Sequence, residues 1–336
     1  MDGFVTMDHG SGGVKTSELI DSLLRPAFHN PTLDALGDGA LLPNPGCAQL
    51  AFSTDSFVVQ PIEFPGGDIG KLAVCGTVND LAMCGAKPLW LSLSMILEEG
   101  LPLATLERVV QSIARTAKEA GVMVVTGDTK VVERGHGDGI YLNTAGVGAV
   151  MCPGLTPDAI REGDKVIVTG PVGDHGAAVM LARSELGIES DFTSDCMPLH
   201  QLAQAAWETA QGGLRCLRDA TRGGVATTLC EFAEGHEFSI TLEEALVPVR
   251  PQVRMACELL GLDPLYCANE GRMLAVVAPD RADEVLSAIR NLPGGEDAAI
   301  IGTVNTRWPG KVTLQNAYGA NRILTKLTGA QLPRIC

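Results

Sequence analysis

The sequence predicts two mixed α/β (or α+β) domains of similar size, followed by a short tail. The length of 336 residues suits two domains of ordinary size, and 46% hydrophobic residues supply a core for each. Stretches with strand and helix character alternate through both halves, which is typical of mixed folds. Two prolines and a glycine within residues 151–157 mark the change between the halves. We therefore expect domains at residues 1–150 and 151–325, and a flexible tail at 326–336.

Helices and strands alternate in the first half. The clearest helix covers residues 102–120, because Pro102 and Gly121 suit its first turn and its end and the residues between them are amphipathic. A strand at 122–132 is expected to be interrupted at residues 127–130. The remaining elements are predicted as helices at 17–28 and 68–84, a loop at 31–45, and strands at 50–59, 90–97 and 140–150.

The second half mixes strands and helices in the same way. Segments with helical spacing of apolar residues alternate with short apolar runs of strand length. The strands are expected at 164–169, 273–278 and 299–304, and the helices at 175–186, 198–210, 225–234, 251–260 and 282–291. The two halves share no visible short repeat.

The composition argues against several classes of protein. A formal net charge of −15 disfavours a broad surface for nucleic acid or for an anionic membrane. None of the ten cysteines belongs to a Cys-x-x-Cys pair, so zinc ribbons, thioredoxin-like sites and iron–sulfur clusters lack support. The first residues lack a signal-peptide pattern, and no apolar run reaches membrane-spanning length. We expect a cytoplasmic protein with reduced thiols.

The chain ends in a thiol, that of Cys336. Pro333 cannot continue a helix, so a short extended tail is expected, and an unpinned tail is normally mobile. Such a tail could receive a group on its sulfur at one place and present it at another. Arg334 favours the thiolate, whereas the neighbouring carboxylate disfavours it. The other interpretation is that Cys336 is an incidental terminal thiol.

Four aspartates of the first half lie near the ends of predicted elements, beside small residues. Glycines flanking two of them allow the backbone to approach a ligand closely. Mg²⁺ requires oxygen ligands, and converging carboxylates would repel one another unless cations lay between them. The alternative is that they are ordinary turn and cap residues. The four are Asp38, Asp55, Asp80 and Asp128.

Three further positions carry candidate chemistry. Residues 219–224 precede a predicted helix, where backbone N–H groups could receive phosphate and Asp219 could bind a metal. A helix cap with a glycine turn explains the same residues. Glu270 is either a general base or a solvated turn residue. Lys130 follows Asp128 by two positions, so both side chains are expected on one face of the strand, where Lys130 could meet phosphate or transfer a proton.

The Gly-rich segment near the N-terminus resembles a P-loop, but the resemblance fails. A P-loop needs Gly immediately before Lys15, where this chain has Val14, and no buried strand precedes the segment. The remaining options are a flap that closes over a site, with His9 at its edge, or a floppy terminus.

Taken together, the motifs resemble the ATP-dependent PurM-like superfamily, which includes aminoimidazole ribonucleotide synthetase, selenophosphate synthetase and thiamine-monophosphate kinase. The motifs occur in order as Gly37-Asp38-Gly39-Ala40, Ser53-Thr54-Asp55, Asn79-Asp80-Leu81-Ala82-Met83-Cys84-Gly85-Ala86, Gly127-Asp128-Thr129 and Asp219-Ala220-Thr221-Arg222-Gly223-Gly224. With the tail Pro333-Arg334-Ile335-Cys336 added, the whole chain resembles the HypE family of hydrogenase maturation factors.

The resemblance implies a PurM-like fold, a homodimer formed largely through the N-terminal domains, and ATP with Mg²⁺ near the dimer and domain interface. Relatives often carry two acidic residues where this chain has Asp38-Gly39, so the number of Mg²⁺ ions stays open. The implied nucleotide-binding residues are Asp38, Asp55, Asn79, Asp80, Gly127, Asp128, Thr129, Asp219, Arg222 and Gly223. The five aspartates in this set are the implied metal ligands.

The resemblance also implies the reaction and its partners. The carbamoyltransferase HypF places a carbamoyl group on Cys336, and this chain dehydrates the group to S-cyanide with ATP. The cyanide passes to iron on the HypC–HypD complex, for the NiFe-hydrogenase site. Glu270 and Lys130 are the implied groups for proton transfer.

Two alternatives remain. One is a small-molecule kinase or synthetase of the same superfamily, acting on thiamine phosphate or making selenophosphate. The stretch from Gly10 to Gly13 lacks the reactive cysteine that selenophosphate synthetases usually carry. The other is a non-catalytic scaffold whose terminal thiol anchors a metal or a partner, which nucleotide binding would distinguish from an enzyme.

Overall fold

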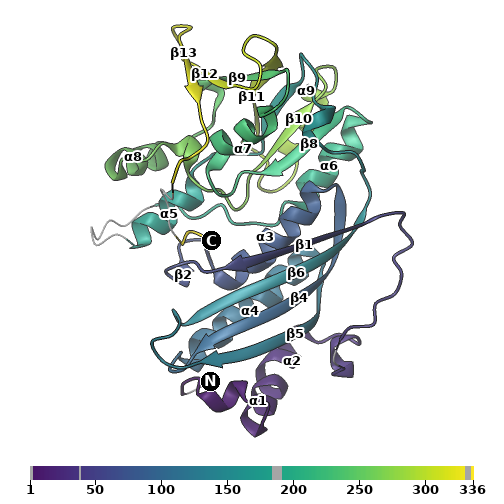
Figure 1. Cartoon of the computed structure of the whole chain (residues 1–336), viewed down its shortest axis with the longest axis vertical. Helices are drawn as coiled ribbons and strands as arrows, with labels where there is room; N and C mark the ends of the chain where they lie inside the picture. Colours follow the sequence, from purple (N-terminus) through teal and green to yellow (C-terminus); the bar gives the residue numbers. More distant parts are fainter. Residues whose placement is uncertain (1–2, 38, 184–190, 330–333) are drawn as a thin grey trace.

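The computed structural model describes residues 3–37, 39–183, 191–329 and 334–336. It consists of two lobes, each built on its own β-sheet, and the end of the chain lies between them (Figure 1). The predicted two-domain α/β fold is therefore confirmed. Within these residues, no helix is long and apolar enough to cross a membrane.

The N-terminal lobe is built on a four-stranded mixed sheet in the order β1-β6-β4-β5. Its parallel pair, β4 and β5, is joined by helix α4, because parallel neighbours need a crossover connection. A small hairpin of β2 (Glu63–Phe64) and β3 (Gly67–Asp68) precedes the first long helix. The elements are β1 (Leu50–Phe57), β4 (Ala86–Glu98), α4 (Leu103–Ala120), β5 (Met123–Val132) and β6 (Ile140–Val150).

Helix α3 (Ile69–Met83) is the central helix of the molecule. It begins at Asp68, whose Oδ1 accepts hydrogen bonds from the N–H groups of Gly70 and Lys71 at 2.7 and 3.0 Å. Thirteen of its 15 residues are buried, because α3 packs between the N-terminal sheet and the C-terminal lobe. Both lobes therefore meet on this helix.

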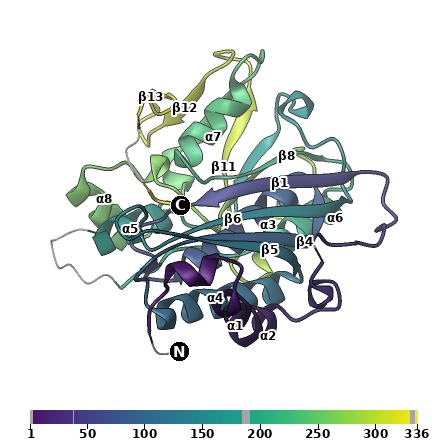
Figure 2. The ribbon, with the colours of Figure 1, turned by 60° about the horizontal axis from the view of Figure 1, so that its bottom comes forward.

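The N-terminal segment forms consecutive helical turns beside the β5 edge of the sheet (Figure 2). The turns are α1 (Val14–Leu19), a π-helical turn at Ile20–Leu24 and α2 (Arg25–Phe28), which cover the helix expected at 17–28. A 3₁₀ turn at Met7–Gly10 precedes them.

The C-terminal lobe is built on a seven-stranded sheet in the order β13-β12-β9-β11-β7-β10-β8. Helix α7 covers one face, and α6 and α9 cover the other. All five residues of β10 are buried and alternate between the two faces, as the period of a strand requires. The elements are β7 (Lys165–Val168), α5 (Asp174–Arg183), α6 (His200–Ala210), β8 (Leu214–Asp219), α7 (Gly224–Ala233), β9 (Ser239–Glu243), α8 (Pro251–Leu260), β10 (Met273–Val277), α9 (Ala282–Arg290), β11 (Ala299–Asn305), β12 (Val312–Gln315) and β13 (Asn321–Leu324).

Two expectations about strands need correction. The strand expected to break at residues 127–130 is continuous as β5, because its backbone keeps pairing with β4 through these residues. Four strands of the C-terminal sheet, β8, β9, β12 and β13, were not predicted. Each is only four to six residues long and is held by its neighbours in the sheet rather than by a strong local pattern.

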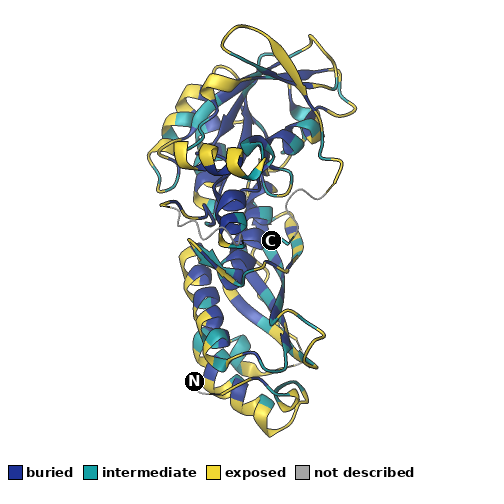
Figure 3. Cartoon of the chain, turned by 90° about the vertical axis from the view of Figure 1, so that its left-hand side faces the viewer, coloured by how far each residue is buried: buried dark blue, intermediate teal, exposed yellow. Residues whose placement is uncertain are grey.

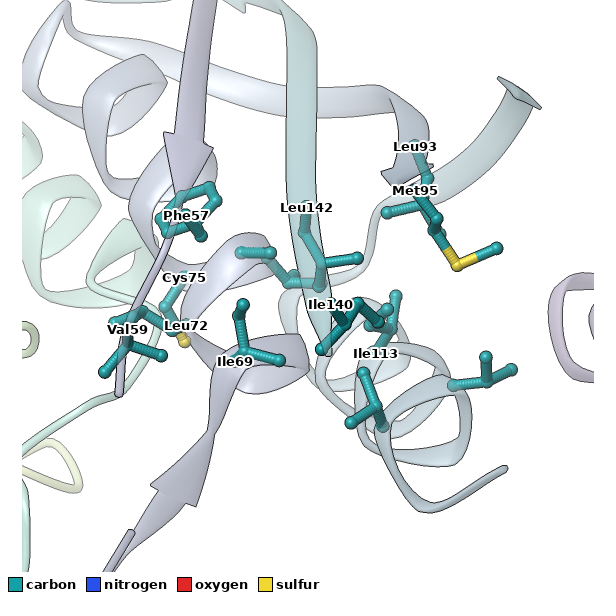
Figure 4. Close-up of a cluster of buried hydrophobic side chains, with 14 of the residues drawn as sticks. Phe57, Val59, Ile69, Leu72, Cys75, Leu93, Met95, Ile113, Ile140 and Leu142 are labelled. Atoms are coloured by element: carbon teal, nitrogen blue, oxygen red, sulfur yellow. The ribbon is translucent and has the colours of Figure 1, made fainter. Parts of the chain in front are cut away.

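Buried residues run continuously through the junction of the lobes (Figure 3). The core of the N-terminal lobe includes Cys75 of α3, which lies close to Val59 just beyond β1 (Figure 4). Cys196 from the C-terminal half and Ile335 from the end of the chain join the same core. The last residues of the chain are therefore part of the packing between the lobes.

Candidate active site

Acidic side chains from both lobes meet where β1, the end of α3 and the end of β8 converge. Alternation along β1 turns Ser53 and Asp55 toward α3, and the Ser53 hydroxyl donates to Asp80 Oδ2 at 2.6 Å. Asp219 is the last residue of β8 and lies close enough to Asp55 and Asp80 to interact with their charges. Three of the predicted aspartates are thus brought together.

This carboxylate cluster carries more negative charge than its surroundings offset. Burial raises the pKa of both Asp55 and Asp80, and the charge of Asp80 adds to the effect on Asp55. Burial and the neighbouring Asp80 raise the pKa of Asp219 to about 7. Arg218 and Arg222 act in the opposite direction on Asp80. The cluster therefore favours either protons or an added cation.

Glu270 lies beside the cluster in the segment that leads into β10, and it is only 2% exposed. Its backbone N–H donates to Asp195 Oδ1 at 3.0 Å, whereas its Oε1 has no hydrogen-bond partner among the described residues. Burial, and then the neighbouring Cys196 and Asp219, raise the pKa of Glu270 well above its ordinary value. The alternative of a solvated turn residue is therefore wrong.

Asn79 connects the two lobes beneath this cluster. Its side-chain N–H groups lie 3.2 Å from the Met197 carbonyl oxygen and 3.3 Å from that of Glu270. Its Oδ1 accepts the backbone N–H of Leu199 at 2.7 Å. The side chain thus holds the Glu270 segment against α3, a contact that the sequence prediction of nucleotide binding did not include.

The last three residues run antiparallel to the segment that follows β1. The Val58 N–H donates to the backbone oxygen of Cys336 at 3.1 Å, and the Gln60 N–H donates to the Arg334 carbonyl oxygen at 3.3 Å. Between them, Ile335 is 2% exposed and packs into the core of the N-terminal lobe. These residues are docked against the segment after β1 by the two backbone hydrogen bonds. Mobility of the tail remains a prediction.

The docked thiol of Cys336 lies close enough to Glu270 for the charge of Glu270 to affect it. Burial, and then the charge of Glu270, raise the pKa of Cys336 to about 12, against the influence of Arg222. Arg334, expected to favour the thiolate, instead forms an ion pair with Asp138 at 2.8 Å. The thiol is therefore protonated at neutral pH when the tail is docked.

Asp128 and Lys130 lie elsewhere, on the other edge strand of the N-terminal sheet. The strand register places Asp128 level with Ser94 and, across the sheet, with Ser56, so about 14 Å separates it from β1. This face is the opposite of the one on which Asp55 meets α3. Lys130 Nζ lies 2.8 Å from Asp128 Oδ1, as expected for neighbours on one strand face, and its hydrogen bond lowers the pKa of Asp128.

The Gly-rich segment near the N-terminus packs against this same strand. Gly10, Gly127 and Thr129 all line a cavity of about 470 Å³ beneath α1 and α2. A Cβ atom at Gly10 would lie 2.6 Å from the backbone N of β5, so only glycine allows this approach. His9 accepts the Thr6 N–H at 3.0 Å through Nδ1 and closes the turn. A structured segment over Asp128 thus replaces the option of a floppy terminus.

The turn after β8 is built from two glycines in left-handed conformation. Gly223 and Gly224 have φ angles of 78° and 61°, and a Cβ on Gly224 would lie 2.5 Å from the Leu265 carbonyl oxygen. Gly223 begins α7 without a side-chain cap, so the interpretation of Asp219 as a helix cap is wrong. Arg222 projects from this turn close enough to influence the charges of the cluster.

Comparison with known proteins agrees with this architecture. The chain matches the N-terminal and C-terminal domain models of AIR synthase related proteins at residues 36–150 and 161–315. It is 49% identical to the carbamoyl dehydratase HypE of Azotobacter vinelandii, over 99% of this chain and 98% of the relative. The chain belongs to the HypE family.

Solved HypE structures have the same fold. A crystal structure of the hydrogenase maturation protein HypE in complex with ATP matches with a TM-score of 0.93 and 45% identity, covering 98% of this chain and 99% of that one. A HypE–HypF complex matches with a TM-score of 0.79 and 44% identity, covering 92% and 99%.

The donor chemistry of the carboxylate cluster suits Mg²⁺, although the cluster is not a metal cage. Asp38 lies outside the described residues. Within the described ranges, no group of three or more His, Cys, Asp or Glu side chains is placed to hold a metal ion. Mg²⁺ is usually bound by one or two carboxylates together with phosphate oxygens, so a complete protein cage is not required.

Sequence reasoning missed the residues that support the tail and Glu270. Among them, only His175 carried a local signal. It stands with Asp174 between two glycines, as Asp38 does. Asp195 and Arg272 form a buried ion pair with 3.6 Å between the charged atoms. Arg272 follows the candidate base Glu270 by two positions, but nothing in the sequence pairs it with Asp195. Their role depends on contacts between segments far apart in the chain.

Proposed function

We propose that this chain is an ATP-dependent carbamoyl dehydratase that converts an S-carbamoyl group on its own Cys336 into S-cyanide. One observation carries the proposal: the Cys336 side chain is docked where the charges of Glu270 and of Asp55 in the carboxylate cluster act on it. The name of the closely similar family members supports the reaction type, and the ATP complex of a HypE protein supports the nucleotide.

The chemistry fits the residues at this site. An amide oxygen is a poor leaving group, and transfer of the ATP γ-phosphoryl group to it makes phosphate the leaving group. The S–C(=O)–NH₂ group loses its oxygen as phosphate and both N–H protons, giving S–C≡N, ADP and phosphate. Glu270 in its ionised form is the proposed proton acceptor, because its charge reaches the Cys336 thiol and its Oε1 has no hydrogen-bond partner among the described residues.

The protonated state of the docked thiol supports a division of labour. A neutral thiol is a poor nucleophile, so loading of the carbamoyl group should take place with the tail undocked. An S-carbamoyl group is uncharged and can enter the buried position at less cost than a thiolate. HypF is the proposed donor, supported by the HypE–HypF complex among the relatives. The cyanide is then proposed to pass to iron on HypC–HypD.

Mg²⁺ is the proposed ion for the carboxylate cluster. Asp55, Asp80 and Asp219 would hold it, and it would neutralise phosphate charge in the transferring nucleotide. The raised pKa values of these carboxyl groups support such a site, because a bound cation would offset their burial and, for Asp55 and Asp219, the repulsion from Asp80. Protonation alone would explain the same shifts, and metal titration distinguishes the two.

A homodimer is proposed to complete the site. The face of the N-terminal sheet away from α3 exposes Phe52, Ile96 and Met123, an apolar set that a second copy could cover. Asp128 and Lys130 lie on that face, so a two-fold partner could bring them to the cluster that they do not reach within one chain. Lys130 is then the second proposed group for proton transfer.

The test is the intact mass of the protein incubated with HypF, carbamoyl phosphate and ATP, beside a reaction with a non-hydrolysable nucleotide. We expect a carbamoyl adduct that loses one water only with ATP. Cys336→Ala should give no adduct but still bind nucleotide, whereas Cys84→Ala, an exposed thiol near Asp80, should react normally. Nucleotide binding without any adduct in the unchanged protein would instead favour a small-molecule kinase of the superfamily.

A further inference from the structure

A chain of hydrogen bonds runs beneath the docked tail. The Cys196 N–H donates to Ser194 Oγ at 3.0 Å, Ser194 Oγ lies 2.8 Å from His175 Nδ1, and His175 Nε2 lies 2.9 Å from the Ile335 carbonyl oxygen. All four residues in this chain of bonds are buried. The last peptide group of the molecule is therefore held by a defined polar contact inside an apolar core.

The partners fix the direction of each bond. A carbonyl oxygen can only accept, so His175 Nε2 carries the proton that is donated to Ile335. Burial lowers the pKa of His175, which favours the neutral ring. Its Nδ1 then accepts from the Ser194 hydroxyl, which in turn accepts from the Cys196 N–H. Each donor in these three hydrogen bonds is therefore matched by an acceptor, with His175 neutral and its proton on Nε2.

The same short segment also holds Glu270. Asp195 stands between Ser194 and Cys196, its Oδ1 accepts the Glu270 N–H, and its Oδ2 lies 3.6 Å from Arg272 Nε. Residues 194–196 thus contact the tail on one side, through the histidine, and the Glu270 backbone on the other. The separation between the tail and Glu270 depends on this segment.

His175 and Ser194 are held in place by contacts with the β2–β3 hairpin. The His175 ring meets the Phe64 ring edge-on, with 5.4 Å between centroids and an interplanar angle of 85°. The Ser194 N–H donates to the Pro65 carbonyl oxygen at 2.8 Å, and a Cβ on Gly66 would lie 2.8 Å from the Ser194 backbone. The β2–β3 hairpin of the N-terminal lobe therefore holds His175 and Ser194 in place.

We propose that His175 is a positioning residue that seats the tail, acting with Ser194 to fix the last peptide group so that Cys336 faces Glu270. Arg183 contributes to the same seat, because its guanidinium donates to the Arg334 carbonyl oxygen at 2.7 Å and to that of Gln60. The consequence for catalysis rests on the proposed function, whereas docking itself does not.

Docking can be measured without the reaction. Trypsin cleaves after Arg334, and docking of the tail withholds this bond from the protease, so release of Ile335-Cys336 from the intact chain reports the undocked fraction. His175→Phe keeps the ring against Phe64 but removes both hydrogen bonds, and we expect release to accelerate about tenfold. His175→Gln retains a donor and an acceptor, and release should stay near that of the unchanged protein.

His236→Phe is the matched control, because His236 also packs against a phenylalanine ring, that of Phe238, in the C-terminal lobe. It should leave the release rate unchanged. Ser194→Ala keeps the histidine and removes its hydroxyl partner, so it should also accelerate release. This second variant tests the proposal even if His175→Phe fails to fold. Equal release from the unchanged protein, His175→Phe and Ser194→Ala would overturn the proposal.

The catalytic consequence is tested on protein already carbamoylated at Cys336, in a single turnover with ATP. We expect His175→Phe to slow loss of water about tenfold while nucleotide affinity is unchanged, and His175→Gln to restore the rate. If His175→Phe releases its tail faster but the unchanged protein shows no dehydration, the proposed function is refuted, whereas the role of His175 in docking the tail stands. Unchanged dehydration in His175→Phe, despite faster tail release, would overturn the positioning role.

Discussion

The carboxylate cluster between the lobes and the Asp128–Lys130 pair on β5 carry similar motifs in opposite environments. In the cluster, burial and neighbouring acids raise the carboxyl pKa values, including that of Asp219 to about 7. On β5, the pair is exposed, and the hydrogen bond from Lys130 lowers the pKa of Asp128. The comparison shows that the glycines beside an aspartate allow the backbone to approach a ligand closely. The charge state of the aspartate is set instead by the residues that the fold packs around it.

The largest effect is expected at Glu270, the most buried acid of the first region. Glu270→Gln keeps the shape of the side chain but cannot accept a proton, so dehydration of the S-carbamoyl group should fall by about 10²- to 10⁴-fold. Single-turnover rates with ATP measure this, with the exposed Glu237→Gln as the control. A rate within threefold of the unchanged protein, roughly 0.7 kcal/mol in barrier, would exclude Glu270 as the base.

A complementation experiment tests whether the two regions, separate within one chain, come together in a dimer. If a dimer builds each site from Asp219 of one copy and Asp128 of the other, Asp219→Asn and Asp128→Asn alone should both be inactive. Random co-assembly of the two variants should then restore about a quarter of the activity, because half of the dimers carry one intact site. No recovery in verified mixed dimers would show that the two aspartates do not share a site across the interface.

The two regions should also differ in how stability depends on pH. The pKa of Asp219 is higher in the folded chain, at about 7, than the ordinary value of 3.8. Its contribution is therefore fully present below pH ~4 and is lost as the pH rises through about 7. We expect Asp219→Asn to remove this decline, a change of roughly 4 kcal/mol in the free energy of unfolding between these limits. Denaturant titrations at several pH values measure it, and parallel curves for the two proteins would contradict it.

The smallest effect is expected on β5. Asp128→Asn removes an exposed ion pair, so the free energy of unfolding should change by less than about 0.5 kcal/mol at neutral pH. The lowered pKa of Asp128 gives its pH dependence the opposite sign, with stability lost only on acidification through the carboxyl range. Thermal unfolding of this variant beside Asp219→Asn completes the comparison, and a large loss for Asp128→Asn would show that its edge strand depends on the pair.

Local patterns predicted much of the framework. The amphipathic helix that became α4 ends at Gly121, whose φ of 68° requires the residue type that marked it in the sequence. The alternation that put Lys130 beside Asp128 is likewise a property of the strand alone. The short strands β9, β12 and β13 escaped prediction, because four or five residues carry little periodicity and pairing supplies their stability.

By itself, the sequence determined the order of the motifs, the two α/β domains and the presence of a thiol at residue 336. Only the tertiary structure decided that Glu270 is buried, that Asn79 joins the lobes, and that His175 holds the tail. The physical reason is that burial, charge repulsion and hydrogen-bond partners depend on residues brought together from distant parts of the chain. Such contacts leave no periodic trace in the segments that make them.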